Sequence, residues 1–341
     1  MNSKPSRARR LAGFAAKLAF TGVCLAWAFS QIDWDHSVFR NPRGISMPWL
    51  AAGIAMAGAS VWLNALRWWF FLRAQNLDVG IGRATELTMI GNFFSLLSLG
   101  GIGGDAARVL MLIREHPGRK LVITMAVMVD RLAGIVALGG IFFVVSAARF
   151  EALADPSVLG RGVIRFAWFQ LGGGFALVLL FFLMASPPMH QWIHGSGRFD
   201  RWPVIRRIPE IYDVYRVRWR HALAGVAVSV VMFFVFFGSF WCAMRAVGGD
   251  VQAVDVITAM PVIDAVSGLP ISVAGVGVRE KLFEVLMHDL AGVPATIAVS
   301  ASLLGFASNT AWALLGALLF LRKRDRVTVA DIERESDLRG D

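Results

Sequence analysis

Hydrophobic runs long enough to cross a bilayer dominate the chain. A helix needs about 20 apolar residues to span the hydrocarbon layer, and six stretches qualify: 11–30, 47–66, 121–147, 163–185, 221–247 and 294–321. Two further stretches, 84–104 and 256–278, are apolar but interrupted by glycine, and each ends in a glycine cluster followed by a charged residue. The pattern predicts an all-α, polytopic membrane helical bundle with about six full spans and two re-entrant helical hairpins.

The composition supports a membrane protein. Of the 341 residues, 56% are hydrophobic and 17% are charged, whereas about 25% are charged in a typical soluble domain. A soluble chain with this composition would expose large apolar patches, and disordered, fibrous and disulfide-rich classes are excluded. The two cysteines, Cys24 and Cys242, lie in apolar runs without metal-ligand spacing. We therefore expect no cofactor and no metal.

Basic residues fall mainly on one side of the predicted membrane domain. The net charge is +10, and with six spans all the strongly basic segments except loop 31–46 share one face, which the positive-inside rule makes cytoplasmic. This places both tails, 1–10 and 322–341, inside, around one membrane domain at 11–321. This orientation requires 84–104 to enter and leave on the cytoplasmic face and 256–278 to enter and leave on the outer face. Nucleic acid is not an expected partner.

Two segments have more than one interpretation. The N-terminus resembles a signal peptide, but Trp27 and Phe29 stand where small residues would precede cleavage, so an uncleaved first helix is expected. Loop 186–220 alternates basic with aromatic residues. It is either an interfacial segment lying among anionic head groups or an ordinary basic loop.

The two glycine clusters resemble each other. Residues 98–105 read SLGGIGGD and residues 272–279 read SVAGVGVR, so that Gly101 aligns with Gly275 and Gly103 with Gly277. The spans before them run in opposite directions, which predicts an inverted repeat of residues 47–147 and 221–321, an arrangement common in secondary transporters. The glycines either permit close helix packing or expose N–H groups that hold an anion.

Charged residues are expected at membrane depth. Asp130 and Arg131 lie about ten residues into a span, near the bilayer centre, where an unpaired charge is costly. Arg131 is expected to pair with Asp105 or Glu280, and Asp130 with Arg108 or Arg279; Asp264 is a further acid within the second hairpin, and Asn92 a hydrogen-bonding amide on the first. These groups form either a structural ion-pair network or a set of arginines that bind a head-group phosphate.

These residues carry a family resemblance. Asn92 with Gly103-Gly104-Asp105 and Arg108, then Asp130-Arg131, then Leu269-Pro270 and Gly275-Val276-Gly277-Val278-Arg279-Glu280 resemble the lysylphosphatidylglycerol synthase transmembrane-region family over residues 10 to 322. The chain departs from the family pattern before the first glycines, where the family often has a proline and this sequence has Ser98-Leu99. The family includes the flippase half of the multiple-peptide-resistance factor and membrane proteins linked to hopanoid biosynthesis.

The resemblance implies a transporter or flippase of the bacterial cytoplasmic (inner) membrane that moves a lipid or lipid-linked head group. Its expected partners are membrane lipids with anionic or phosphate-bearing head groups and lipid-biosynthesis enzymes. We expect no enzymatic activity, because roughly 20 residues after the last span are too few for a transferase domain. The alternative is a membrane enzyme, accessory or scaffold protein of phospholipid, hopanoid or lipid-linked sugar biosynthesis. The candidate substrate-binding residues are Asn92, Gly101, Gly103, Gly104, Asp105, Arg108, Asp130, Arg131, Asp264, Pro270, Gly275, Gly277, Arg279 and Glu280.

Overall fold

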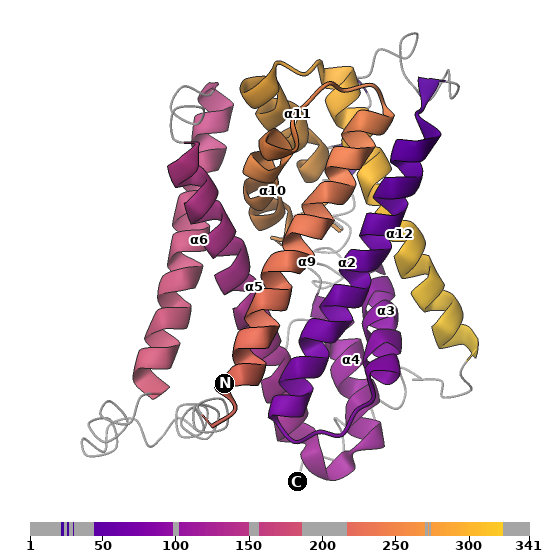
Figure 1. The fold of residues 1–341 in the computed structure, drawn as a ribbon, viewed down its shortest axis with the longest axis vertical. Coiled ribbons are helices and arrows are strands. Elements are labelled where there is room, and N and C mark those ends of the chain that lie inside the picture. The colour runs from indigo at the N-terminus through magenta and orange to yellow at the C-terminus, as the bar shows by residue number, and fades with distance from the viewer. Residues whose placement is uncertain are drawn as a thin grey trace, which may run out of the picture.

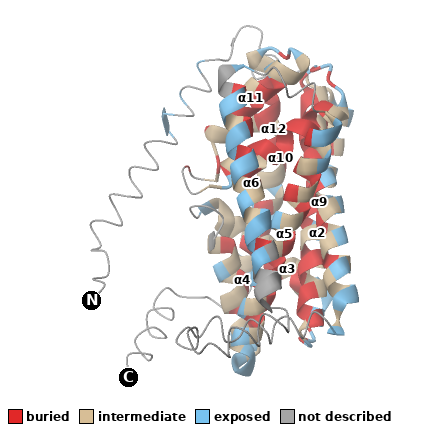
Figure 2. Ribbon diagram, turned by 90° about the vertical axis from the view of Figure 1, so that its left-hand side faces the viewer, coloured by how far each residue is buried: buried red, intermediate tan, exposed pale blue. Residues whose placement is uncertain are grey.

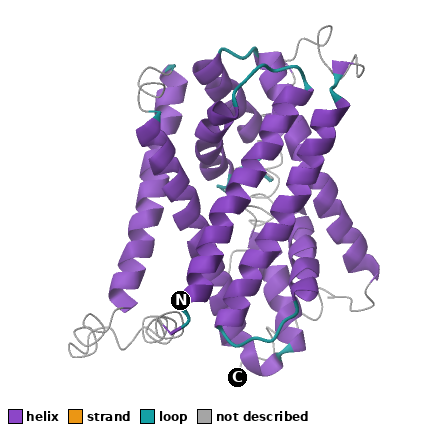
Figure 3. Cartoon of the chain, in the orientation of Figure 1, coloured by secondary structure: helices purple, strands orange, loops and turns teal. Residues whose placement is uncertain are grey.

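The computed structural model describes residues 44–97, 102–149, 157–185, 217–269, 272 and 274–322, together with Gly22, Val23, Ala26 and Ser30. Most of the predicted span 11–30, the tails 1–10 and 323–341, loop residues 186–216, Gly101 and Pro270 lie outside the described residues. Within the described part, every element is helical, so the predicted all-α class is confirmed (Figure 3).

The described chain contains nine α-helices and a short 3-10 helix, η2 (Pro117–Arg119). The α-helices are α2 (Met47–Ala74), α3 (Ile81–Leu97), α4 (Ile102–Glu115), α5 (Lys120–Ala148), α6 (Val158–Ala185), α9 (Trp219–Ala246), α10 (Ala253–Ser267), α11 (Val278–Ala291) and α12 (Ala295–Arg322).

Among the described residues, four helical segments are long and apolar enough to cross a membrane: α2, Pro117–Ala148, α9 and α12. They coincide with four of the predicted spans, and α6 covers the predicted span 163–185. The prediction that the second span ends at residue 66 is wrong, because α2 continues to Ala74. Arg67 suggested a loop, but its guanidinium is paired with Asp130 inside the bundle, which allows the helix to continue.

The chain folds as two halves of the same design. Each half has a 28-residue helix, α2 or α9, then a pair of shorter helices, then another long helix, α5 or α12. The N–H of Ser46, just before α2, donates to the carbonyl of Ala246 at the end of α9 (2.9 Å), so these packed helices are antiparallel. Figure 1 shows the pair α3–α4 and the pair α10–α11 at opposite ends of the bundle.

Side-chain contacts repeat between the halves at a shift of 172 positions. The indole N–H of Trp69 donates to the carbonyl of Val79 at 2.9 Å, and that of Trp241 donates to the carbonyl of Val251 at 3.1 Å. Both contacts fix the connection between a long helix and the following short pair. The same shift relates the ion pair Arg73–Asp78 to the pair Arg245–Asp250.

The core lies between the helices, and the outer surface is apolar. Figure 2 shows buried residues along the inward faces and exposed residues outward. Outward residues include Phe169, Val144 and Leu321, which are 80%, 70% and 77% exposed. Such large exposed apolar side chains are unfavourable in water and suit a lipid-facing surface.

Glycine allows α12 to approach α3 closely. A Cβ at Gly316 would overlap the backbone carbonyl of Met89 and come within 3.0 Å of the N atom of Ile90. By contrast, a Cβ at Gly82, which lies on α3 as Met89 and Ile90 do, would meet nothing within 4 Å. The α3–α12 contact therefore depends on the absence of a side chain at 316.

Gly316→Ala is expected to destabilise the protein by about 1–3 kcal/mol, because a methyl group would push two helix backbones apart. Thermal unfolding in detergent micelles measures the effect as a lower Tm. Gly82→Ala is the control and should keep or raise the Tm, since alanine favours an open helical position. Equal unfolding temperatures for the two variants would contradict this account.

Candidate functional site

Three adjoining cavities lie between the two pairs of short helices. The largest has a volume of about 840 Å³, and the others have about 280 and 240 Å³. Asp264 of α10 lines all three. Asn92 and Ser95 of α3 each line two of them. The cavities therefore form one region that is bounded by both halves and has polar side chains in its lining.

The lining follows the internal repeat. Asn92 and Asp264 occupy equivalent positions at the shift of 172, and both line the 240 Å³ cavity. Ser95 and Ser267 are likewise equivalent, and both line the 280 Å³ cavity. The repeat thus brings matching positions of α3 and α10 to a common central space.

A buried ion pair joins α2 to α5. The Nε and Nη2 atoms of Arg67 donate to the two carboxylate oxygens of Asp130 at 2.7 and 3.0 Å, and Nη2 also donates to Asn64 at 3.1 Å. Asp130 is fully buried. The predicted partner Arg108 lies at 3.8 Å, so it is secondary to Arg67, and the alternative partner Arg279 belongs to another part of the region. Bidentate geometry explains the preference for Arg67.

A second carboxylate, Asp105 on α4, lies next to this ion pair. Asp105 accepts hydrogen bonds from Arg108 and Arg131, so the expected Arg131–Asp105 pair is present. The guanidinium of Arg108 lies 5.1 Å from the ring centroid of Trp68. Its Nη1 atom is buried and has no hydrogen-bond partner among the described residues. Arg108 therefore retains donor capacity beside the largest cavity, which it lines.

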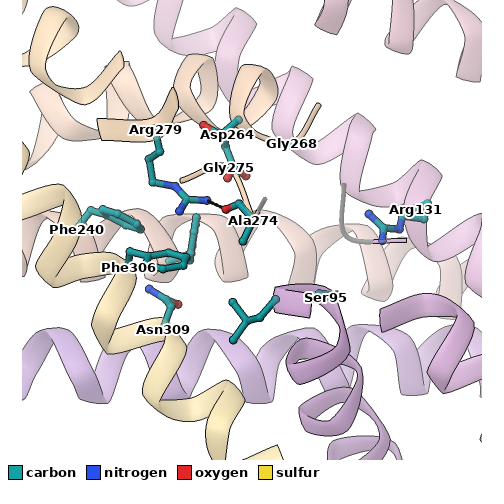
Figure 4. A pocket seen from close by; sticks show the side chains of 13 residues that line it. Ser95, Arg131, Phe240, Asp264, Gly268, Ala274, Gly275, Arg279, Phe306 and Asn309 are labelled. Atoms are coloured by element: carbon teal, nitrogen blue, oxygen red, sulfur yellow. Dashed lines mark hydrogen bonds between the residues drawn. The ribbon is translucent and has the colours of Figure 1, made fainter. Parts of the chain in front are cut away.

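Arg279 on α11 supplies a cation from the second half of the chain. Its guanidinium lies 5.1 Å from the ring centroid of Phe306, and Nη2 donates to the carbonyl of Ala274 at 3.4 Å. Its Nε and Nη1 atoms are buried without a partner in the described chain. Figure 4 shows Arg279, Asp264 and Asn309 around the 280 Å³ cavity.

Glu280 is placed away from these cavities. It is fully buried, and its carboxylate accepts the backbone N–H of Gly277 and the hydroxyl of Ser302 (3.3 Å). The alternative pairing of Arg131 with Glu280 is therefore not adopted. Glu280 caps the N-terminus of α11, where it satisfies a donor that the helix leaves unpaired.

The two glycine clusters perform different structural tasks. A Cβ at Gly104 would overlap the hydroxyl of Ser95 and the backbone of Gly91, so Gly104 permits close packing of α3 and α4. Gly275 and Gly277 have φ angles of +76° and +86°, which glycine adopts without strain. Packing therefore explains Gly104, and a turn explains the second pair. Gly103 lies half-buried in the first turn of α4.

Several polar residues of the cavity were missed by the sequence prediction, namely Asn64, Arg67, Ser95, Gln170 and Asn309. Each interrupts an apolar helical run. Intramembrane polar residues usually face the interior of a bundle, and Asn64 and Arg67 are also three positions apart, on one helix face. Treating Arg67 as the end of a span concealed this signal.

The largest cavity has an apolar flank between α5 and α6. Ile135 and Leu138 of α5 face Phe169, Gly173 and Leu177 of α6 along this side of its lining. Phe169 and Leu177 are also 80% and 67% exposed. The cavity consequently joins a charged interior to the apolar outer surface of the bundle.

Comparison with known proteins identifies one family. The model of the family described as "Lysylphosphatidylglycerol synthase TM region" matches residues 14–318 of the chain, which confirms the predicted resemblance. No curated protein and no solved structure matches the chain. The match covers most of the sequence, and with the membrane-spanning helices it indicates a multi-pass membrane protein with a lipid-related function. The chain belongs to the lysylphosphatidylglycerol synthase transmembrane-region family.

Proposed function

We propose that the protein transports lipids or lipid-linked head groups between the leaflets of the bacterial inner membrane and binds an anionic head group between its two hairpins. The observation that carries the proposal is the amphipathic cavity of about 840 Å³. Its interior is lined by Arg67, Arg108 and Arg131, and its flank by apolar residues of α5 and α6. A lipid has the same division between a polar head and apolar tails.

Unused arginine donors support an anionic head group. Arg108 Nη1 and Arg279 Nε and Nη1 are buried with no acceptor in the described chain. Leaving such donors unpaired is costly, whereas phosphate oxygens accept from guanidinium in bidentate fashion. Arg108 and Arg279 come from different hairpins, so one phosphate-bearing head group could engage both halves of the repeat.

A transporter accounts for the repeat better than an enzyme does. Sites at the interface of inverted repeats are typical of secondary transporters, in which the halves move about a fixed central site. An enzyme, accessory or scaffold function does not require two structurally equivalent halves around one site. We therefore propose a non-enzymatic function and assign the charged residues to binding.

Arg279→Gln is expected to lower transport of fluorescent phosphatidylglycerol by about tenfold or more, since each charge-assisted hydrogen bond contributes about 1.5–3 kcal/mol. Transport is measured in proteoliposomes as the labelled lipid that becomes accessible to a membrane-impermeant quencher. The control is Arg245→Gln, because Arg245 pairs with the 97% exposed Asp250 outside the cavities. Equal transport by both variants would exclude Arg279 from the site.

The apolar flank yields a second test. Gly173→Leu should slow lipid transport by roughly tenfold, equivalent to about 1.4 kcal/mol, because the side chain would obstruct the side of the cavity where acyl chains leave. Gly162→Leu on the same helix is the matched control, since a Cβ at either glycine meets nothing within 4 Å and only Gly173 lines the cavity. Unchanged transport by Gly173→Leu would refute this exit path.

We further propose that α3–α4 and α10–α11 are re-entrant hairpins that enter the membrane from opposite faces. Cysteines introduced at Gly118 and His288, both exposed, should react with an impermeant thiol reagent from opposite faces: position 118 from the cytoplasm and position 288 from outside. Native Cys24 and Cys242 are first replaced by alanine. Labelling of both positions from one face would contradict the proposed topology.

A further inference from the structure

We propose that Asp264 is the proton-binding group that couples proton uptake to head-group binding. The inference rests on the proposed function, because it assigns the ion that accompanies an anionic head group into the same site. It starts from a difference between the two halves at the centre of the molecule.

Asp264 breaks the symmetry of the repeat at a lining position. Its equivalent in the first half is Asn92, a neutral amide of nearly the same shape, and both face the 240 Å³ cavity. One half therefore presents a carboxyl group that can gain and lose a proton where the other half has a group that cannot. Acidic residues in such membrane cavities are characteristic of proton pathways.

Asp264 differs from the other cavity carboxylates in its partners. Asp130 and Asp105 accept direct hydrogen bonds from arginines. The Asp264 carboxylate forms no hydrogen bond and no ion pair within 4.0 Å among the described residues, although it interacts electrostatically with Arg279. Direct arginine pairs offset the charges of Asp130 and Asp105, whereas Asp264 has no such direct partner among the described residues.

The charged and polar groups around Asp264 define what its protonation affects. The charged groups that line the cavities come from four helices: Arg67 of α2, Asp105 and Arg108 of α4, Asp130 and Arg131 of α5, and Arg279 of α11. The other helices, α3, α6, α9 and α12, contribute neutral side chains, including Asn92, Gln170, Phe236 and Asn309. Arg67, Arg108 and Arg131 already face carboxylates. Arg279 is the cation whose charge Asp264 offsets.

An anionic head group and ionised Asp264 compete for Arg279. When Asp264 is ionised, it partly neutralises Arg279 and repels an incoming phosphate. When Asp264 is protonated, the positive charge of Arg279 is no longer offset, and a phosphate at its two unpaired donors is attracted more strongly. By thermodynamic linkage, protonation must then strengthen head-group binding, and head-group binding must draw a proton onto Asp264. One proton enters with each anionic head group, and the carboxylate loses it when the head group leaves.

The test measures proton uptake directly. Full-length protein in a weakly buffered, uncharged detergent is titrated with dihexanoyl phosphatidylglycerol while a pH indicator records protons taken up. The phosphodiester remains anionic between about pH 5 and pH 9, so uptake reports the protein. We expect up to one proton per lipid bound in the wild type, and an affinity that falls by about tenfold or more as the pH rises.

Asp264→Asn is expected to abolish proton uptake and to bind with the low-pH affinity at every pH. The substitution introduces the residue already present at the equivalent position, Asn92. Asp264→Glu should retain uptake and serves if the amide variant does not fold. The matched control is Asp250→Asn, which removes a carboxylate paired with Arg245 outside the cavities and should behave as the wild type does.

The outcomes separate the two proposals. Binding of the lipid without proton uptake, or uptake that persists in Asp264→Asn, would overturn the coupling role and leave the proposed function intact. Absence of lipid binding by the wild type at every pH would overturn the proposed function and the coupling together. Loss of uptake in Asp250→Asn would also count against Asp264, because it would place the proton elsewhere.

Discussion

The pairing of arginine with carboxylate inside an apolar bundle is the interaction on which the arrangement of the central helices depends. Arg67 on α2 pairs with Asp130 on α5 at 2.7 Å, and Asp105 on α4 pairs with Arg131 on α5. Arg67 and Asp130 are both buried, and loss of one partner from a buried pair typically costs about 3–5 kcal/mol, so this pair fixes α2 against α5. The half-exposed Arg131 joins α5 to α4 through Asp105. Both pairs also keep charge at the wall of a cavity, where an isolated charge would be prohibitive.

Equivalent helices of the two halves surround the central cavities, but the charged residues that line the cavities differ between the halves. Trp69 and Trp241 make the same contact at the same place in each half, which shows that the scaffold is shared. The charges that line the cavities are not shared. The first half carries the chain of paired ions, and the second carries Arg279 with Asp264, so the two sides of one central space differ in how firmly their charges are fixed.

The structure distinguishes between the two interpretations of the glycine clusters, close helix packing and anion binding by backbone N–H groups. Exposed N–H groups near Gly277 suggested an anion site, but Glu280 occupies that donor by capping α11. Gly104 is needed for the approach of α3 to α4, and Gly275 for its positive φ angle. Each pair of short helices brings an arginine with unused side-chain donors to the cavities, Arg108 from α4 and Arg279 from α11.

The sequence alone predicted the all-α class, six spans of which four match long apolar helices of the described chain, the family and most of the charged residues, because apolar length and intramembrane charge are local properties of the chain. It offered Asp105 or Glu280 as the partner of Arg131, and the structure shows Asp105. Only the tertiary structure decided that Arg67 pairs with Asp130, that Glu280 caps a helix, and that Asn92 and Asp264 face a common cavity. These contacts join residues distant in sequence, so they depend on how helices pack, and hydrophobic periodicity carries no information about that packing.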